Sequence, residues 1–268
     1  MSNEQSKGQL TLRVGKNTLS FTSVDPQNAE QPIVFEPYVV KSGISMAANL
    51  REAFKGAELL RTGLNSVRVV VDSPVLMVPV EQFEESKMAD MYHHAFPGNG
   101  QDSVLYNVLP DLNAVAVFTI NRDLKLVVDD HFQNVRLVCA LSPVWRLLHQ
   151  RSFTGAYNKL YGYFHEQQLD IFAFQQNRFK FCNQFEVRRA HDAIYFLLYV
   201  WKQLVMDSEH DELHLLGDLP ERDWLMQELK KYLAKAYVIN PTAEFNRAPA
   251  SLIKGMPFDL MTLITKGR

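Results

Sequence analysis

The chain has 268 residues, of which 47% are hydrophobic and 22% are charged, a composition typical of a globular protein of one or two domains. Its 28 basic and 30 acidic residues give a net charge of −2, which argues against the basic surface that nucleic-acid-binding proteins need. We therefore expect no nucleic acid among its partners.

Cysteine usage and hydropathy predict a cytoplasmic protein. Cys139 and Cys182 are too few for a disulfide framework and lie in apolar, strand-like runs, so we expect small buried side chains there. Residues 1–10 lack the apolar core of a signal peptide. The longest apolar run, Ala193–Trp201, is too short to cross a bilayer, so no membrane span is expected.

The first half of the chain predicts three strands, a helix and a further strand. Apolar residues alternate on both sides of the tip Gly15-Lys16-Asn17-Thr18, which is typical of a β-hairpin, and residues 32–40 extend it. Residues 43–60 have apolar side chains at helical spacing. Val67–Ser73 is a β-branched run suited to a strand that is buried on both faces.

The second half predicts the same order of elements. Residues 159–187 contain three strand-like pieces, and an apolar helix follows at His191–Asp207. The strand at 212–218, the amphipathic helix at 220–236 and the strand at 236–240 complete the order. The run Ala193–Trp201 is apolar on all sides, which is typical of a helix that is deeply buried or covered by a partner, and we expect burial between the sheet and the subdomain.

The two halves therefore read as two copies of a βββαβα unit. Placing Leu19 on Leu169 also places Phe21 on Ile171, with weak identity but consistent element order. The alternative is a chance likeness between two ordinary α/β stretches. We predict a first lobe at 8–152 and a second at 153–268.

A small α+β subdomain is predicted at about residues 74–132, inserted into the first lobe. The pattern predicts helices at Phe83–Phe96 and Arg122–His131, with strongly β residues at Asn113–Ile120 between them. The pairs Val78-Pro79 and Asn121-Arg122 precede these helices.

This layout resembles the actin-like ATPase superfamily, whose fold is ribonuclease H-like. The inserted segment, with Val78-Pro79 and Asn121-Arg122 at its helix starts, is similar to that of the pilus-assembly M proteins. It also resembles the cytoplasmic domain of type II secretion L proteins and the actin-like cell-division protein. The whole chain looks like an uncharacterised bacterial family, of Bacteroidetes type, that is assigned this fold.

The resemblance implies a nucleotide site that this sequence retains only in part. In the superfamily, Asp-x-Gly in each first hairpin approaches phosphate and organises hydrated Mg²⁺, and a Gly-Gly pair follows the fourth strand of the second half. The first hairpin here has a Gly but no Asp, and the second has neither at its tip. Candidate residues for an interlobe cleft are Gly15, Lys16, Asn17, Asp72, His165, Glu166, Gly217 and Asp218.

Turn chemistry explains the first hairpin tip most simply, because Gly and Asn tolerate positive φ. Lys16 could instead hold phosphate as a point charge. A P-loop is excluded, because the position five residues before Gly15 is Leu10.

No metal site and no catalytic residue is predicted. His165-Glu166-Gln167-Gln168 begins like a zinc motif, but the second ligand position is Leu169. His210 and His214 have the spacing of a helical metal pair, but the leucines that follow favour a strand that would separate them. We find no nucleophile-elbow, dinucleotide-binding or Cys/His signature.

The leading hypothesis is a non-catalytic scaffold protein, a pseudo-ATPase that binds a protein partner of unknown identity and needs no cofactor. The alternative is an actin-like ATPase that binds ATP and Mg²⁺ with acids drawn from Asp72, Asp170 or Asp218. Whether the chain is an enzyme stays open, because a fold does not determine an activity.

Overall fold

A computed structural model describes residues 9–25, 27–28, 30–98, 102–175 and 178–266. The predicted lobe ends at residues 8 and 267–268 lie outside the described residues. The chain forms two compact units, one of residues 1–108, 115–142 and 252–256, the other of residues 109–114, 143–251 and 257–268. Each unit is described by itself.

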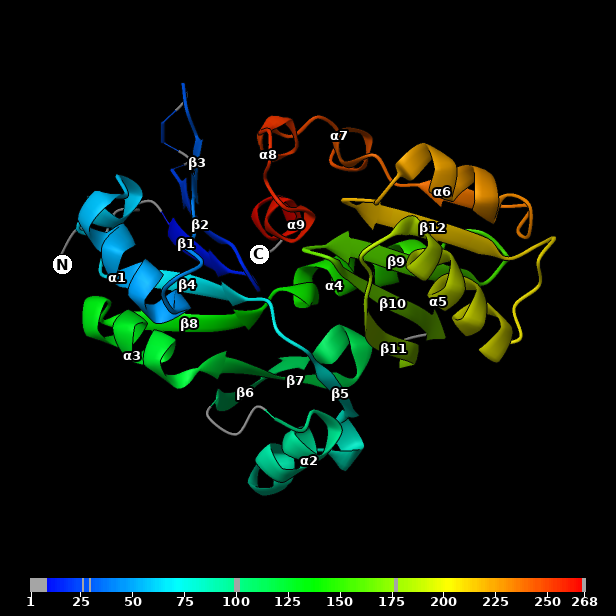
Figure 1. The fold of residues 1–268 in the computed structure, drawn as a ribbon, viewed down its shortest axis with the longest axis horizontal. Helices are drawn as coiled ribbons and strands as arrows, with labels where there is room; N and C mark the ends of the chain where they lie inside the picture. The colour runs from blue at the N-terminus through cyan, green and yellow to red at the C-terminus, as the bar shows by residue number, and fades with distance from the viewer. Residues whose placement is uncertain (1–8, 26, 29, 99–101, 176–177, 267–268) are drawn as a thin grey trace. The chain divides into compact units, whose positions relative to one another are not determined.

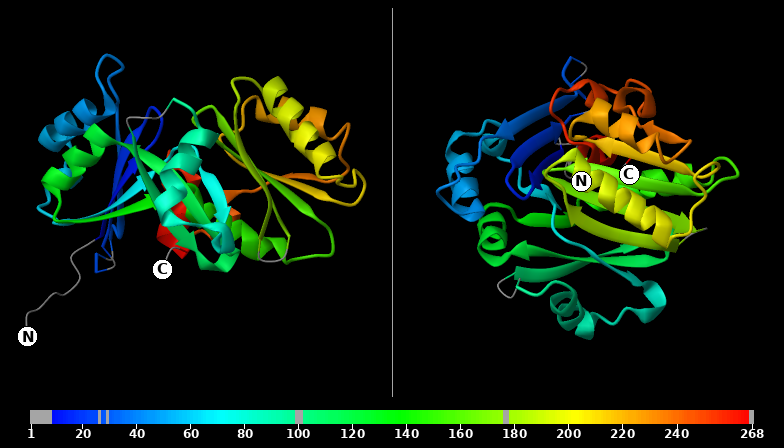
Figure 2. Two further views of the ribbon diagram at one scale, coloured as in Figure 1. Left: turned by 90° about the horizontal axis from the view of Figure 1, so that it is seen from below. Right: turned by 45° about the vertical axis from the view of Figure 1, so that its right-hand side comes forward.

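The first unit contains a five-stranded sheet in the order β3-β2-β1-β4-β8. Its strands are β1 (Gln9–Val14), β2 (Leu19–Val24), β3 (Ile33–Tyr38), β4 (Ser66–Val71) and β8 (Asn134–Cys139). The first three strands are antiparallel, whereas β4 and β8 run parallel to β1. Helices α1 (Met46–Gly56) and α3 (Arg122–His131) lie side by side (Figures 1 and 2), and the ring of Phe54 stacks on that of His131.

The second unit repeats this topology in the order β11-β10-β9-β12-β13. Its strands are β9 (Lys159–His165), β10 (Gln168–Gln175), β11 (Arg178–Glu186), β12 (Glu212–Gly217) and β13 (Ala236–Val238). Equivalent atoms repeat as well: the Asp72 N–H donates to the Val14 carbonyl at 2.9 Å, and the Asp218 N–H donates to the Phe164 carbonyl at 2.9 Å. The predicted duplication of the sheet is confirmed.

Helices α5 (Ala190–Gln203) and α6 (Arg222–Leu229) cover one face of the second sheet (Figures 1 and 2). Gly162 permits close packing of this core, because a Cβ there would lie 3.3 Å from the Cδ2 atom of Leu197 on α5 and 2.8 Å from that of Leu215 on β12. The prediction that α5 is buried between the sheet and the subdomain was wrong. A helix that lies on a sheet buries one face only, and Tyr195 and Tyr199 are 64% and 50% exposed.

The inserted segment forms a three-stranded sheet in the order β5-β7-β6. Its elements are β5 (Leu76–Pro79), α2 (Met88–Ala95), β6 (Asp102–Leu109) and β7 (Ala114–Asn121). Val78, Tyr92, Val115 and Val117 form its buried core.

The helix expected at Phe83–Phe96 begins later, at Met88, after two short 3₁₀ turns. The backbone of Phe83 is extended, and its ring lies 4.9 Å from that of Tyr106 in the small core, so packing overrides the helical pattern. By contrast, α3 has the predicted bounds. The Asn121 side chain caps it by accepting the N–H groups of Asp123 and Leu124.

One side chain of the inserted segment bonds to the outer strand of the first sheet. The Asn107 Oδ1 atom accepts the Cys139 N–H at 2.8 Å, and the Asn107 amide donates to the Leu137 carbonyl at 3.2 Å. Strand β8 ends the strand order of that sheet. Asn107 therefore satisfies backbone groups of β8 that lack a neighbouring strand.

The remaining helices follow the two sheets. They are α4 (Leu141–Ser152), α7 (Pro241–Glu244), α8 (Pro249–Leu252) and α9 (Phe258–Lys266). The Trp145 ring of α4 meets the rings of Phe172 and Phe179 edge-on, on the second sheet. None of the helices in the described part of the chain combines the length and apolar character needed to cross a membrane.

Both cysteines are free thiols. Cys139 is buried, as predicted, and burial raises the pKa of its thiol to about 12. Cys182 is only partly buried.

Candidate functional site

The first hairpin tip turns the chain, as predicted. The Gly15 N–H donates to the Thr18 carbonyl at 2.9 Å, and Lys16 and Asn17 lie exposed between these residues. The expected physical reason was wrong, because neither Gly15 nor Asn17 is among the described residues with positive φ.

Asp72, a candidate cleft acid, is held in a buried ion pair. The Arg13 guanidinium lies 3.1 Å from the Asp72 carboxylate, with exposed fractions of 2% and 6% for the two side chains. Arg13 also donates to the Thr18 hydroxyl at 3.3 Å. Sequence reasoning missed this partner, because Arg13 lies on β1 and Asp72 follows β4, so only the pairing of these strands brings them together.

The second hairpin turns through two residues that are not glycine. Glu166 and Gln167 have φ values of 44° and 64°, and they lie between the paired residues His165 and Gln168. Two-residue hairpin turns of this kind favour Asn-Gly, because side chains are strained at positive φ. The backbone of Glu166 and Gln167 is therefore strained in the folded chain.

The buried side chains behind this turn bond to one another. The His165 Nε2 atom lies 2.5 Å from the carboxylate of Asp170, and the His165 ring stacks on the Tyr163 ring. Tyr163 occupies the position equivalent to Arg13, and its hydroxyl donates to the buried carboxylate of Asp259 at 3.1 Å. Asp170, a possible magnesium acid, is thus paired with His165.

Gly217 and Asp218 lie beside the end of β9. The φ of Gly217 is +87°, and a Cβ there would lie 2.0 Å from the Phe164 carbonyl oxygen, so only glycine fits. Asp218 is exposed. Within each unit, the structure therefore brings the predicted residues to the carboxyl ends of two parallel strands. That the two sets share one interlobe cleft stays a prediction.

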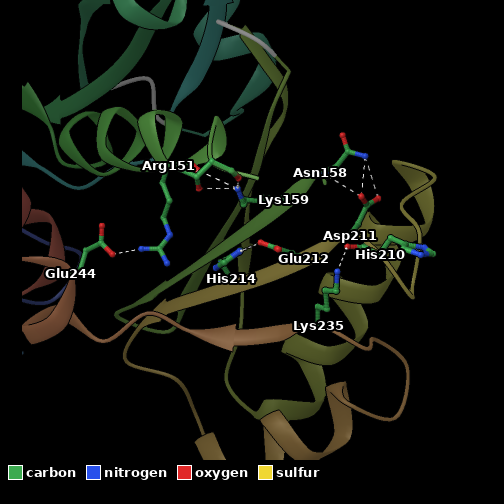
Figure 3. A network of polar contacts seen from close by, with 10 residues as sticks. Arg151, Asn158, Lys159, His210, Asp211, Glu212, His214, Lys235 and Glu244 are labelled. Carbon is green, nitrogen blue, oxygen red and sulfur yellow. Dashed lines mark hydrogen bonds and ion pairs between the residues drawn. The ribbon is translucent and has the colours of Figure 1, made fainter. Parts of the chain in front are cut away.

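A polar cavity that the sequence did not reveal lies beside β12 and β13 in the second unit. Its volume is about 630 Å³, and its lining includes Arg151, Glu212, His214, Tyr237, Asn240 and Glu244. Figure 3 shows two acid–base pairs there: Arg151 with Glu244, and the His214 Nε2 atom with the Glu212 carboxylate at 2.8 Å. The parallel pairing of β9 with β12 places Glu212 beside Lys159. The residues around the cavity come from separate segments of the chain, so they could have been grouped only if the strand register were known.

His214 is buried between the rings of Tyr161 and Tyr237, at 5.6 and 5.4 Å. Burial lowers the pKa of His214, and the charges of Arg151 and Lys159 act in the same direction, against the hydrogen bond with Glu212. Burial also lowers the pKa of Lys159 and raises that of Tyr161. These pKa shifts favour neutral groups in this cluster.

The predicted separation of His210 from His214 is confirmed. His214 lies on β12, whereas His210 is exposed in the preceding loop and bonds to the Asp207 carboxylate at 3.0 Å. Over the described residues, no group of three or more His, Cys, Asp or Glu side chains could hold a metal ion.

Comparison with known proteins confirms the predicted fold and resemblance. A family model described as "Protein of unknown function (DUF3822)" matches residues 2–236. A Bacteroides thetaiotaomicron protein "with actin-like ATPase fold and unknown function" is 28% identical, with a TM-score of 0.84 and 99% of each chain covered. No curated protein matches the sequence.

Two further solved structures are similar to the chain. The PilM–PilN type IV pilus biogenesis complex is 13% identical, with a TM-score of 0.54 and 96% of each chain covered. The cytoplasmic domain of EpsL, an inner-membrane component of the type II secretion system of Vibrio cholerae, is 12% identical. Its TM-score is 0.42, over 80% of this chain and 84% of that chain.

Proposed function

Because the chain belongs to the DUF3822 family and has the actin-like fold, we propose that it is a non-catalytic, protein-binding member of that fold with a degenerate nucleotide site. It needs no bound nucleotide or Mg²⁺ for this role. The observation that carries the proposal is the buried pair of Arg13 with Asp72.

Magnesium chemistry at the first turn would require this pair to separate. Mg²⁺ is held by carboxylate and phosphate oxygens, but the Asp72 carboxylate accepts from Arg13. Breaking a buried ion pair costs about 3–5 kcal/mol, because one charge stays buried without its partner. The cation at position 13 also stands where a hydrated Mg²⁺ would need an acid.

The second turn supports the same proposal. Backbone N–H groups approach phosphate closely where glycine leaves room, but the tip here is Glu166-Gln167. The acid behind it, Asp170, is paired with His165. The superfamily site requires glycine at the turn and an acid that is available to Mg²⁺. Neither turn combines these two features.

Protein binding is supported by analogy with the PilM–PilN complex, in which a protein of this fold is solved together with another protein. At 13% identity the likeness extends to the fold, and the role comes to this chain only as a proposal.

Thermal unfolding with and without Mg·ATP tests the nucleotide part. We expect no change in Tm at millimolar Mg·ATP, whereas a ligand at 100 times its Kd would stabilise the chain by about 2.7 kcal/mol. A saturable rise in Tm with release of phosphate would contradict the proposal. In that case, loss of the rise in the Lys16→Ala variant, whose side chain is exposed, would place the nucleotide at the first turn.

The protein-binding part needs a direct measurement on a purified pair. Proteins recovered with the chain from cell extract are purified and titrated into it by calorimetry. We expect one of them to bind with defined stoichiometry and a micromolar or lower Kd. The absence of any such binder, combined with nucleotide turnover, would favour the ATPase alternative.

A further inference from the structure

Two arginines lie side by side at the amino end of the parallel strands in the first unit. Arg68 of β4 and Arg136 of β8 are paired in the strand register, so both point to the same face of the sheet. Both line a cavity of about 420 Å³, together with Gln9, Asn65 and Ser66. This cavity lies at the opposite end of the strands from Gly15 and Asp72.

Neither guanidinium has an acidic partner among the residues that the structure describes. The Nε atom of Arg68 is buried and lacks a hydrogen-bond partner there. Burial and the adjacent charge of Arg136 lower the pKa of Arg68. Like charges on neighbouring strands are destabilising, and a buried donor without a partner adds a desolvation cost.

Another arginine of the same sheet has its charge neutralised by an acidic side chain. Arg13 of β1 is buried and pairs with Asp72. Arg13 has an acidic partner, whereas Arg68 and Arg136 have none among the described residues, so a bound anion would neutralise the latter two charges.

We infer that the cavity beside Arg68 and Arg136 is a binding site for a small oxyanion, a phosphate or carboxylate group held between the two guanidinium groups. Guanidinium forks bind both kinds of group through paired hydrogen bonds. Gln9, Asn65 and Ser66 also line the cavity, and their side chains carry amide and hydroxyl donors. The Asn65 carbonyl accepts the N–H groups of Gln133 and Asn134, which joins the segments that precede β4 and β8.

This inference goes beyond the proposed function and does not depend on it, because it concerns the amino ends of β4 and β8 and requires neither nucleotide nor protein partner.

Calorimetric titration of the full chain with inorganic phosphate, and separately with malonate, tests the site at constant ionic strength set with NaCl. We expect saturable binding of at least one anion with a Kd in the millimolar range or below. Binding of phosphate alone would identify a phosphate site, and binding of malonate alone would identify a carboxylate site. Equal binding of both would identify a site that recognises negative charge without further selectivity. Each of these results supports the inference. The absence of saturable binding of either anion would overturn it.

Variants locate the binding. Arg136→Gln, at an exposed position, should weaken it about tenfold or more, as should Arg68→Gln, whereas Arg61→Gln, an exposed arginine outside the cavity, should leave it unchanged. In chloride buffer without these anions, Arg136→Gln should also raise Tm, because it removes the repulsion from Arg68. Unchanged affinity in Arg136→Gln would contradict the site even if Arg68→Gln failed to fold.

Discussion

Arg13 and Asp72 lie 59 positions apart in the sequence, yet the guanidinium of one is 3.1 Å from the carboxylate of the other in the interior of the first unit. The parallel pairing of β1 with β4 brings them together. Their pairing removes both charges from water at the carboxyl ends of β1 and β4. This gives the first turn a structural role that does not require a ligand.

We expect the Asp72→Asn variant to lose about 3–5 kcal/mol of unfolding free energy, because the Arg13 charge stays buried without its partner. Urea unfolding measures the loss. The matched control is Asp218→Asn, the exposed equivalent in the second unit, which should change stability by no more than about 0.5 kcal/mol. Equal losses in both variants would show that Arg13 does not depend on Asp72.

Gly217→Ala should destabilise the chain by about 3 kcal/mol or more, because the new Cβ would meet the Phe164 carbonyl oxygen at a positive φ. Gly56→Ala is the control. Gly56 ends helix α1 with open space around it, so its substitution should be neutral or stabilise by up to about 1 kcal/mol. Denaturant unfolding compares the two variants, and a tolerated Gly217→Ala would contradict the close approach of β12 to β9.

Relief of strain at the second hairpin should stabilise the protein. The double variant Glu166→Asn, Gln167→Gly replaces two side chains at positive φ with the residues that this turn favours, and we expect a gain of about 1–2 kcal/mol. The Tm should rise accordingly. The same Asn-Gly pair at Lys16 and Asn17, where φ is not positive, should give no gain, and a similar gain there would refute the strain argument.

The stability of the chain should depend on His214 below neutral pH. Burial lowers the pKa of this histidine in the folded state, so the unfolded chain binds more protons once the pH falls through about 6.5. This contribution is fully present above that pH and decreases as the pH falls towards the lowered pKa. Urea unfolding between pH 8 and pH 5 should show a shallower decline for His214→Gln than for the unmodified chain. Parallel declines would contradict the lowered pKa.

Local signals in the sequence predicted several elements well. The bounds of α3 follow from Asn121, whose side chain caps the helix, and the alternation around Gly15 predicted the first hairpin. Duplication of the sheet followed from element order, because each strand pattern is local. Where a local pattern competed with packing, as at Phe83, the prediction failed.

Side-chain partners across strands could not be predicted in this way. The pairing of Arg13 with Asp72, the proximity of Arg68 to Arg136 and the cavity beside His214 all depend on the register of parallel strands. Register comes from tertiary packing, which the sequence pattern of a single strand does not specify. The exposed ring of Tyr195 was missed for a related reason, because only the sheet determines which face of α5 is covered.

The two hydrogen bonds that Asn107 makes with β8 bear on how the protein behaves at high concentration. An outermost strand with unpaired N–H and C=O groups can recruit a strand from another molecule and begin aggregation. A single amide at position 107 occupies the Cys139 N–H and the Leu137 carbonyl, so a foreign strand would have to displace it before it could extend the sheet there. Asn107 thus opposes self-association through this edge of the sheet.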